Sequence, residues 1–199
     1  SLLLSIPASL GLILASEEIV NSLFGYGSFS EKDVKLTADA LKYFGYGVPA
    51  FALVKILSNF FFARNNTKTP LYISIFMVII NISISVILFE SYGFIIIPIA
   101  TSISTWIGVL IYIYLLNKKN SLLLNKELIP NFIKVLISTI IMSIMMVLLI
   151  NNYESYLNYS YKFKAIYLLS IVGFVGIVYL LSCYLFGILK LKDYKTNYV

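Results

Sequence analysis

The sequence contains no histidine, one cysteine and few charged residues. Charged residues make up 12% of its 199 residues, about half the share found in soluble domains. Without histidine, the chain lacks the usual general base and the commonest metal ligand. Cys183 is alone, so it cannot form a disulfide or a cysteine metal site within this chain. We therefore predict no metal and no cofactor.

The acidic residues are too dispersed to form a catalytic centre. Lipid-phosphate enzymes need clustered carboxylates that hold a metal, or a nucleophile beside a base. Only Glu31 and Asp33 form a close pair in a predicted loop, and Lys32 lies between them. No glycine-rich phosphate loop follows a strand. We predict no catalytic residue in this segment, which disfavours a membrane enzyme; catalysis in another part of a longer protein stays open.

Long apolar stretches dominate what the chain does contain. Hydrophobic residues make up 60% of the sequence, and the mean hydropathy is +0.91. A helix needs about 20 apolar residues to cross a hydrocarbon core of about 30 Å. We predict an all-α, polytopic transmembrane helix bundle of about six spanning helices, forming one domain over residues 1–199. The predicted spans are Leu2–Phe24, Ala38–Phe62, Pro70–Phe89, Phe94–Leu116, Ile129–Ile150 and Ala165–Leu189.

The first apolar stretch begins at the start of the chain, which has no initiator methionine. It is unlike a signal peptide because no basic residue precedes it. Glu17 and Glu18 also stand where small cleavage-site residues would be expected. We interpret Leu2–Phe24 as a truncated spanning helix and the chain as a fragment of a longer protein.

Basic residues are unequally divided between the two sides of the membrane. The connections 63–69 and 117–128 share one side with the tail from Lys190, and the connections 25–37, 90–93 and 151–164 share the other. Eight basic residues against four predict, by the positive-inside rule, that the first side and the C-terminus are cytoplasmic. The positive charge is then topological, and we expect no nucleic acid as partner. The eight are Arg64, Lys68, Lys118, Lys119, Lys126, Lys190, Lys192 and Lys195, and the four are Lys32, Lys35, Lys162 and Lys164.

Lys55 is the most informative polar residue because it lies within a predicted span. Roughly 13 Å of helix separates it from Arg64 at the cytoplasmic end. A lysine at mid-helix costs about 2.5–3.5 kcal/mol on insertion scales and usually faces a bundle interior or water. Asn59 shares its face, and helical side chains lean toward the N-terminus, here toward the midplane. We predict that Lys55, Asn59 and Arg64 bind an anionic headgroup; the alternative is snorkelling of Lys55 to the inner headgroups.

The same predicted span contains Gly45, Gly47 and Pro49. Proline cannot donate to the carbonyl four residues earlier, here that of Gly45, and its ring clashes with it, so we expect a kink. Broken helices at mid-depth are common in transporters that alternate between two openings. A static kink, as in many membrane bundles, fits these residues equally well.

Polar groups in the remaining spans are weaker signals. Asn81 is costly enough inside Pro70–Phe89 to predict a place on a substrate path, whereas the hydroxyl and small residues of Phe94–Leu116 favour close helix packing. The last two spans are almost wholly apolar, which suits contact with lipid tails or peripheral packing. Tyrosines between them predict an aromatic belt at the outer interface: Tyr153, Tyr156, Tyr159 and Tyr161.

From Pro7 to Pro70 the sequence resembles the MurJ/MviN family, the flippases for the peptidoglycan precursor lipid II. The order and spacing of several short motifs carry this resemblance, which thins beyond Pro70. Tyr26 and Asn66 depart from it, since the family commonly has a basic residue and an aspartate there. The matching motifs are Leu23-Phe24-Gly25-Tyr26-Gly27-Ser28-Phe29, Ala40-Leu41-Lys42-Tyr43, Gly47-Val48-Pro49-Ala50-Phe51, Lys55 with Leu57, Phe61-Phe62-Ala63-Arg64 and Thr67-Lys68-Thr69-Pro70.

The resemblance implies a two-lobed transporter of the bacterial cytoplasmic (inner) membrane, with this chain as the C-terminal lobe and the N-terminal lobe absent. It implies that the full protein flips lipid II by alternating access, with the lipid tail along the last two helices. One alternative is a polysaccharide-lipid flippase or multidrug exporter of the same superfamily. Another is a non-transporting scaffold whose partners are cell-wall synthesis enzymes.

Overall fold

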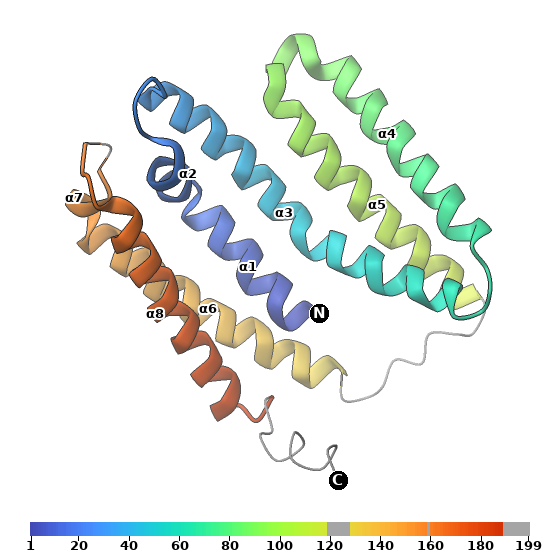
Figure 1. The fold of residues 1–199 in the computed structure, drawn as a ribbon. Helices are drawn as coiled ribbons and strands as arrows, with labels where there is room; N and C mark the ends of the chain where they lie inside the picture. Colours follow the sequence, from blue (N-terminus) through green and yellow to red (C-terminus); the bar gives the residue numbers. More distant parts are fainter. Residues whose placement is uncertain (119–127, 159, 189–199) are drawn as a thin grey trace. The chain divides into compact units, whose positions relative to one another are not determined.

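The computed structural model describes residues 1–118, 128–158 and 160–188. Over these residues the chain is helical and contains no strand, which confirms the predicted all-α class. The chain divides into two compact units, Ser1–Leu123 (unit 1) and Leu124–Val199 (unit 2), and its assignment to one lobe of a larger protein stays a prediction. Five lysines used to predict the topology lie outside the described residues: Lys119, Lys126, Lys190, Lys192 and Lys195. The helices are α1 (Leu2–Leu14), α2 (Ser16–Phe24), α3 (Glu31–Phe62), α4 (Lys68–Tyr92), the 3-10 turn η1 (Gly93–Ile95), α5 (Ile96–Lys118), α6 (Leu128–Asn152), α7 (Glu154–Leu157) and α8 (Lys164–Leu185) (Figure 1).

Helices long and apolar enough to cross a membrane correspond to the predicted spans. Among the described residues, Glu31–Phe62, Lys68–Lys118, Ile129–Asn152 and Lys164–Leu185 meet that requirement, and a bent pair of shorter helices adds a fifth candidate. Lys68–Lys118 has 51 residues, far more than one crossing needs. It folds back at Gly93, whose φ of +63° and ψ of −149° favour glycine, so α4 and α5 supply two crossings.

The first predicted span, Leu2–Phe24, is not one straight helix. It is broken at Ala15 into α1 and α2, which are bent by 74° relative to each other. Glu17 and Glu18 occupy the first turn of α2, where the helix dipole stabilises acidic side chains. The two acids expected inside one span therefore mark the start of a second helix.

The second span begins earlier than the predicted Ala38. Helix α3 starts at Glu31, where Ser30 and Asp33 form a capping box. The Ser30 N–H donates to Asp33 Oδ2 at 2.9 Å, and the Asp33 N–H donates to Ser30 Oγ at 3.3 Å. Glu31 and Asp33, predicted to lie in a loop, thus belong to the first turn of α3.

In unit 1, α3 packs against α1, α2 and α5, and α4 packs mainly against α5 (Figure 1). The rings of Phe61 on α3 and Tyr112 on α5 lie 5.7 Å apart, centroid to centroid. Packing between these helices brings the end of α3, the start of α4 and the end of α5 together. The buried cluster there is Ala50, Leu57, Phe61, Ile73, Val109, Tyr112 and Leu116. Arg64, Lys68 and Lys118 lie just beyond it, at one end of the three helices.

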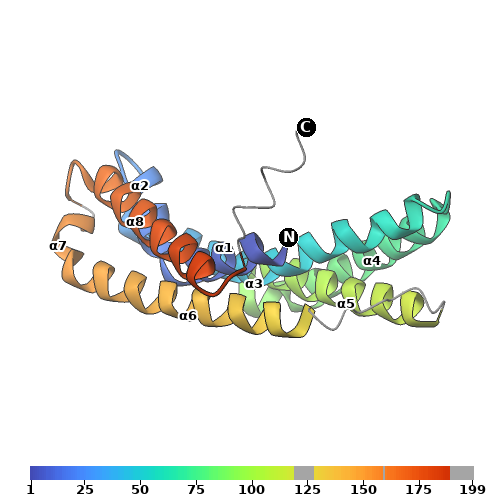
Figure 2. The same cartoon turned by 90° about the horizontal axis from the view of Figure 1, so that it is seen from below.

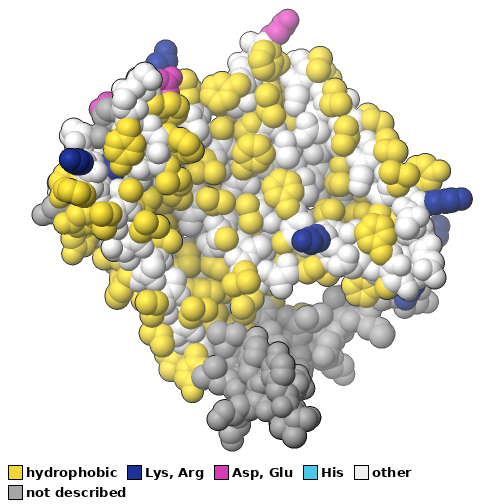
Figure 3. All heavy atoms as spheres, viewed as in Figure 1, with side chains coloured by type: hydrophobic (Ala, Val, Ile, Leu, Met, Phe, Trp, Pro, Cys, Tyr) yellow, Lys and Arg dark blue, Asp and Glu magenta, His cyan; other side chains and the backbone are white. Residues whose placement is uncertain are grey.

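Large apolar side chains cover the outside of the helices. On α4 the side chains of Val86 and Ile87 are 70% and 74% exposed. Figure 3 shows hydrophobic side chains distributed along the helices on one face of the molecule, with few charged ones between them. Apolar patches of this extent are rare on soluble monomers but suit lipid.

Pro49 interrupts the hydrogen bonding of α3 without ending the helix. It has no N–H to donate to the Gly45 carbonyl. The Ser9 hydroxyl of α1 donates to that carbonyl instead, at 2.7 Å in a buried position. From α5, Ser102 Oγ donates to the Tyr43 carbonyl at 2.7 Å, and Trp106 Nε1 donates to the Tyr46 carbonyl at 3.0 Å.

Two glycines allow the neighbouring helices to approach this turn of α3. A Cβ atom at position 45 would lie 2.8 Å from Ile13 Cγ1 and 3.3 Å from the Ser9 carbonyl oxygen. A Cβ atom at position 47 would lie 2.7 Å from Ser102 Oγ. Both distances to the nearest atom are too short for a side chain. Gly45 and Gly47 therefore let α1 and α5 approach closely enough to reach the backbone carbonyls of α3.

In unit 2, α6 and α8 lie side by side, as both Figure 1 and Figure 2 show, and α7 packs against them. Ser138 and Thr139 of α6 and Tyr179 and Cys183 of α8 are buried. Lys164, predicted to be a loop cation, is fully buried at the start of α8. The predicted loop between the two spans also contains α7, so it is partly helical.

Gly45→Ala should destabilise the protein, whereas Gly11→Ala should not. Gly45→Ala forces a Cβ atom against α1 and should lower the free energy of unfolding by about 2 kcal/mol. Gly11 lies in α1 with no atom within 4 Å of its added Cβ. Gly11→Ala should be neutral or stabilise the helix by up to about 1 kcal/mol. Thermal unfolding of the detergent-solubilised protein measures both, and equal melting temperatures would contradict the close packing at Gly45.

Candidate functional site

The second half of α3 has a packed face and a polar face. Leu57 and Phe61 are buried against the core shared with α4 and α5. Lys55 and Asn59 alternate with them in sequence, each two residues before a buried one, and lie on the opposite side of the helix with exposed side chains. Because they are four residues apart, their polar ends share one face. The structure therefore brings together two of the four predicted binding residues.

Lys55 and Asn59 make no side-chain hydrogen bond or ion pair within the described part of the chain. Ser58, three residues after Lys55, uses its hydroxyl to donate to the Lys55 carbonyl at 2.9 Å. An ammonium group and an amide on the same face present several N–H donors and one positive charge. Such a pair can bind the oxygens of a phosphate or diphosphate.

Arg64 lies apart from this pair. It is exposed in the turn between α3 and α4, nine residues and roughly 13 Å of helix beyond Lys55. Asn66 in the same turn accepts a hydrogen bond from the Thr69 N–H at 3.1 Å and donates to Thr69 Oγ1 at 2.9 Å. An aspartate could accept the same backbone bond, so the departure from the family pattern at Asn66 preserves this hydrogen bond at the start of α4.

Asn81 lies on α4 and is bonded to α5. Its Nδ2 atom donates to Thr101 Oγ1 at 2.8 Å, and the Thr101 hydroxyl donates to the Ile97 carbonyl at 2.8 Å. A polar pair of this kind holds neighbouring membrane helices together. The structure gives Asn81 a packing partner, and its predicted contact with substrate stays a prediction.

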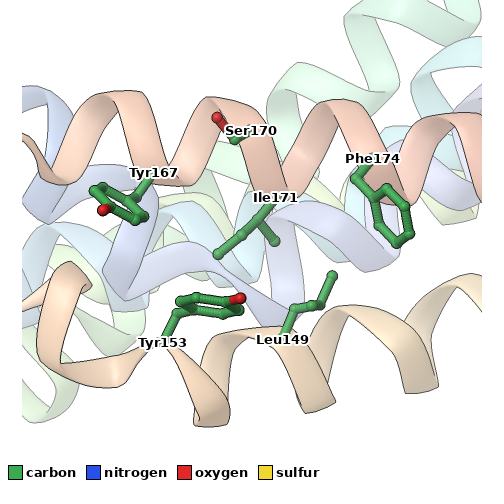
Figure 4. Close-up of a pocket in the computed structure, with 6 residues that line it drawn as sticks. All are labelled: Leu149, Tyr153, Tyr167, Ser170, Ile171 and Phe174. Carbon is green, nitrogen blue, oxygen red and sulfur yellow. The ribbon is translucent and has the colours of Figure 1, made fainter.

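Unit 2 contains a cavity of about 400 Å³ between α6 and α8. Its wall is mostly apolar and includes two tyrosines, whose rings lie on opposite sides in Figure 4. It lies close to the connection between the two helices, next to a group of aromatic rings formed by Tyr161, Phe163 and Tyr167. The lining residues are Leu149, Tyr153, Tyr167, Ser170, Ile171 and Phe174. An apolar groove with polar groups at one end can hold part of a lipid chain.

Sequence reasoning missed the side chains that stabilise the turn before Pro49. Ser9 was not singled out, and Ser102 and Trp106 were not linked to the proline. The proline itself was the available signal, because a carbonyl that loses its donor inside a membrane needs another. Which residue supplies that donor depends on how the helices pack.

The bond between Asn81 and Thr101 should stabilise the contact between α4 and α5. We expect Asn81→Ala and Thr101→Val each to lower the melting temperature, and their double mutant to be less destabilised than the sum. Hydrogen bonds between membrane helices give coupling energies of about 0.6 kcal/mol in such cycles. If the double-mutant cycle shows no coupling energy, and Asn81→Ala loses transport activity while Thr101→Val keeps it, Asn81 contacts the substrate instead.

Known proteins match this chain over most of its length. The family model "Lipid II flippase MurJ" matches residues 1–169. A probable lipid II flippase MurJ from Rickettsia prowazekii is 37% identical over 98% of this chain, and the chain spans only 38% of that relative. One from Borreliella burgdorferi is 31% identical over 97% of this chain and 38% of its own length.

Solved structures show the same likeness in three dimensions. A structure titled "Lipid II flippase MurJ, inward closed conformation" is 28% identical with a TM-score of 0.71, over 93% of this chain and 36% of that one. The fold is therefore that of part of a multi-pass membrane transporter. Together with the family model, which covers more than half of the residues, these matches establish that the chain belongs to the lipid II flippase MurJ family.

Proposed function

We propose that this chain is part of a lipid II flippase, in which the Lys55 face of α3 binds the diphosphate of the headgroup during its passage. The full protein would move the undecaprenyl-diphosphate-linked precursor from the inner to the outer leaflet by alternating access. The observation that carries the proposal is the exposed Lys55–Asn59 pair within a membrane-spanning helix.

The cost of exposing a cation inside a membrane supports this role. A lysine that faced lipid at this depth would be expensive, so such residues normally face water, a substrate path or a protein partner. Leu57 and Phe61 fix the opposite side of α3 against the core, so the helix cannot turn Lys55 inward. Asn59 adds amide donors for oxygens that the ammonium group leaves unpaired.

The cavity of unit 2 supports a place for the lipid tail. The aliphatic and aromatic side chains lining it, with Leu149, Ile171 and Phe174 among them, suit a polyprenyl chain. The tail would then remain in an apolar environment along α6 and α8, while the headgroup crosses on the polar face in unit 1.

The cations at one end of unit 1 support a cytoplasmic location for that end. Arg64, Lys68 and Lys118 gather where α3 and α5 end and α4 begins. By the positive-inside rule this end would face the cytoplasm of a bacterial inner membrane, the side that the sequence also predicts for the C-terminus. In this orientation Arg64 would meet the headgroup as it enters.

The main alternative is a carrier for another lipid-linked sugar or for a drug within the same superfamily. The diphosphate chemistry proposed for Lys55 serves any diphosphate-linked lipid, so the headgroup sugar must be identified by the assay. A scaffold for cell-wall synthesis enzymes would need no cation on the exposed face of α3.

Substitution of Lys55 in the full-length protein tests the proposal. Lys55→Ala should reduce lipid II translocation in proteoliposomes at least tenfold, whereas Lys55→Arg should retain part of it because the charge is kept. Lys32→Ala removes an exposed cation from the first turn of the same helix and is the matched control. Unimpaired transport by Lys55→Ala, at equal protein level, would refute the headgroup role.

A further inference from the structure

The direction of α3 beyond Pro49 determines where the Lys55 side chain lies. Lys55 follows the proline by six residues, less than two turns of helix. The hydrogen bond that a helix would use across this turn is absent, because Pro49 has no N–H for the Gly45 carbonyl. The Gly45 carbonyl then depends on a donor from outside α3.

Ser9 supplies this donor from α1. Its side chain is 6% exposed, and its hydroxyl lies 2.7 Å from the Gly45 carbonyl oxygen. Water has little access to the carbonyl at this buried position, and an unsatisfied carbonyl in an apolar environment costs several kcal/mol. Ser9 therefore replaces the donor that the proline removes.

Ser5 offers an internal comparison. It lies one turn earlier on α1 and is similarly buried, at 8% exposed, but its hydroxyl has no hydrogen-bond partner among the described residues. The two serines thus share their helix and their burial. They differ in the bond to α3, which only Ser9 of the two makes.

Hydrogen bonds from α5 hold the other side of this turn of α3. Ser102 and Trp106 of α5 bond to the carbonyls of Tyr43 and Tyr46, so α3 is bonded to both neighbours around Gly45. Because α5 also packs against Leu57 and Phe61, it supports the half of α3 that carries Lys55. Of these three donors, Ser9 is the one that bonds to the carbonyl that has lost its own helical donor.

We propose that Ser9 is a positioning residue for the Lys55 face: its hydrogen bond to the Gly45 carbonyl fixes the direction of α3 beyond Pro49, so that Lys55 meets the diphosphate. The transport part of this inference rests on the proposed function, but the structural part does not. A hydroxyl that merely fills space would contribute equally whether or not residue 49 has an N–H.

A double-mutant cycle in the full-length protein separates these two roles. Ser9→Ala should lower the melting temperature by several degrees, whereas Ser5→Ala should leave it nearly unchanged. In the Pro49→Ala background the N–H of residue 49 can bond to the Gly45 carbonyl, so adding Ser9→Ala should have little effect. An equal loss in both backgrounds overturns the proposal.

Spin-label distances test the direction of the helix without any transport assay. Labels at Lys35 and Phe62, both exposed on α3, report the distance between its two halves. Ser9→Ala should shift or broaden the distance distribution, and Ser5→Ala should not. A distribution unchanged by Ser9→Ala overturns the claim that Ser9 sets the helix direction.

Transport then tests the link to Lys55. Ser9→Ala should raise the apparent KM for lipid II in proteoliposomes about threefold without lowering the maximal rate. A change of about threefold corresponds to the typical free energy of one hydrogen bond between membrane helices. An unchanged KM overturns the positioning role. If the unsubstituted protein does not transport lipid II, the proposed function fails, and the unfolding and distance measurements still decide the role of Ser9.

Discussion

Proline at position 49 leaves the Gly45 carbonyl of α3 without a helical donor in a part of the molecule that is closed to water. Because a bilayer offers no replacement, this requirement connects three helices: Ser9 of α1 bonds to the orphaned carbonyl, and two donors of α5 bond to carbonyls beside it. Gly45 and Gly47 permit the approach, since a side chain at either position would collide with α1 or with Ser102. Pro49 thus creates the need for outside donors, the two glycines make room for the neighbouring helices, and side chains of those helices supply the hydrogen bonds.

This arrangement has a consequence for the polar residues that follow it. Beyond Pro49 the helix packs one side into the core with Leu57 and Phe61, which leaves Lys55 and Asn59 on the other side. The same packing that stabilises unit 1 therefore keeps a cation exposed within a membrane-spanning helix. A cation in such a place is costly unless it meets water or an anion, and in the proposed function that anion is the diphosphate of the headgroup.

The apolar stretches were sufficient to predict an all-helical membrane fold, because about 20 apolar residues have few other stable arrangements. They failed at Leu2–Phe24, since hydropathy does not distinguish one helix from two; the acids Glu17 and Glu18 were the available sign of a new helix start. The face shared by Lys55 and Asn59 followed from helical periodicity. The bonds of Ser9 and Asn81, and the burial of Lys164, depend on tertiary packing and could not be derived from periodicity.

The central claim is that position 55 borders a water-accessible path that takes the headgroup. Thiol labelling tests it most directly, in the full-length protein with Cys183 and any other cysteine replaced. A Lys55→Cys variant should react with a membrane-impermeant reagent, and lipid II should slow the reaction. An Ile82→Cys variant, on the apolar outer side of α4, should stay unreactive. Equal lack of reaction at both positions would contradict the account.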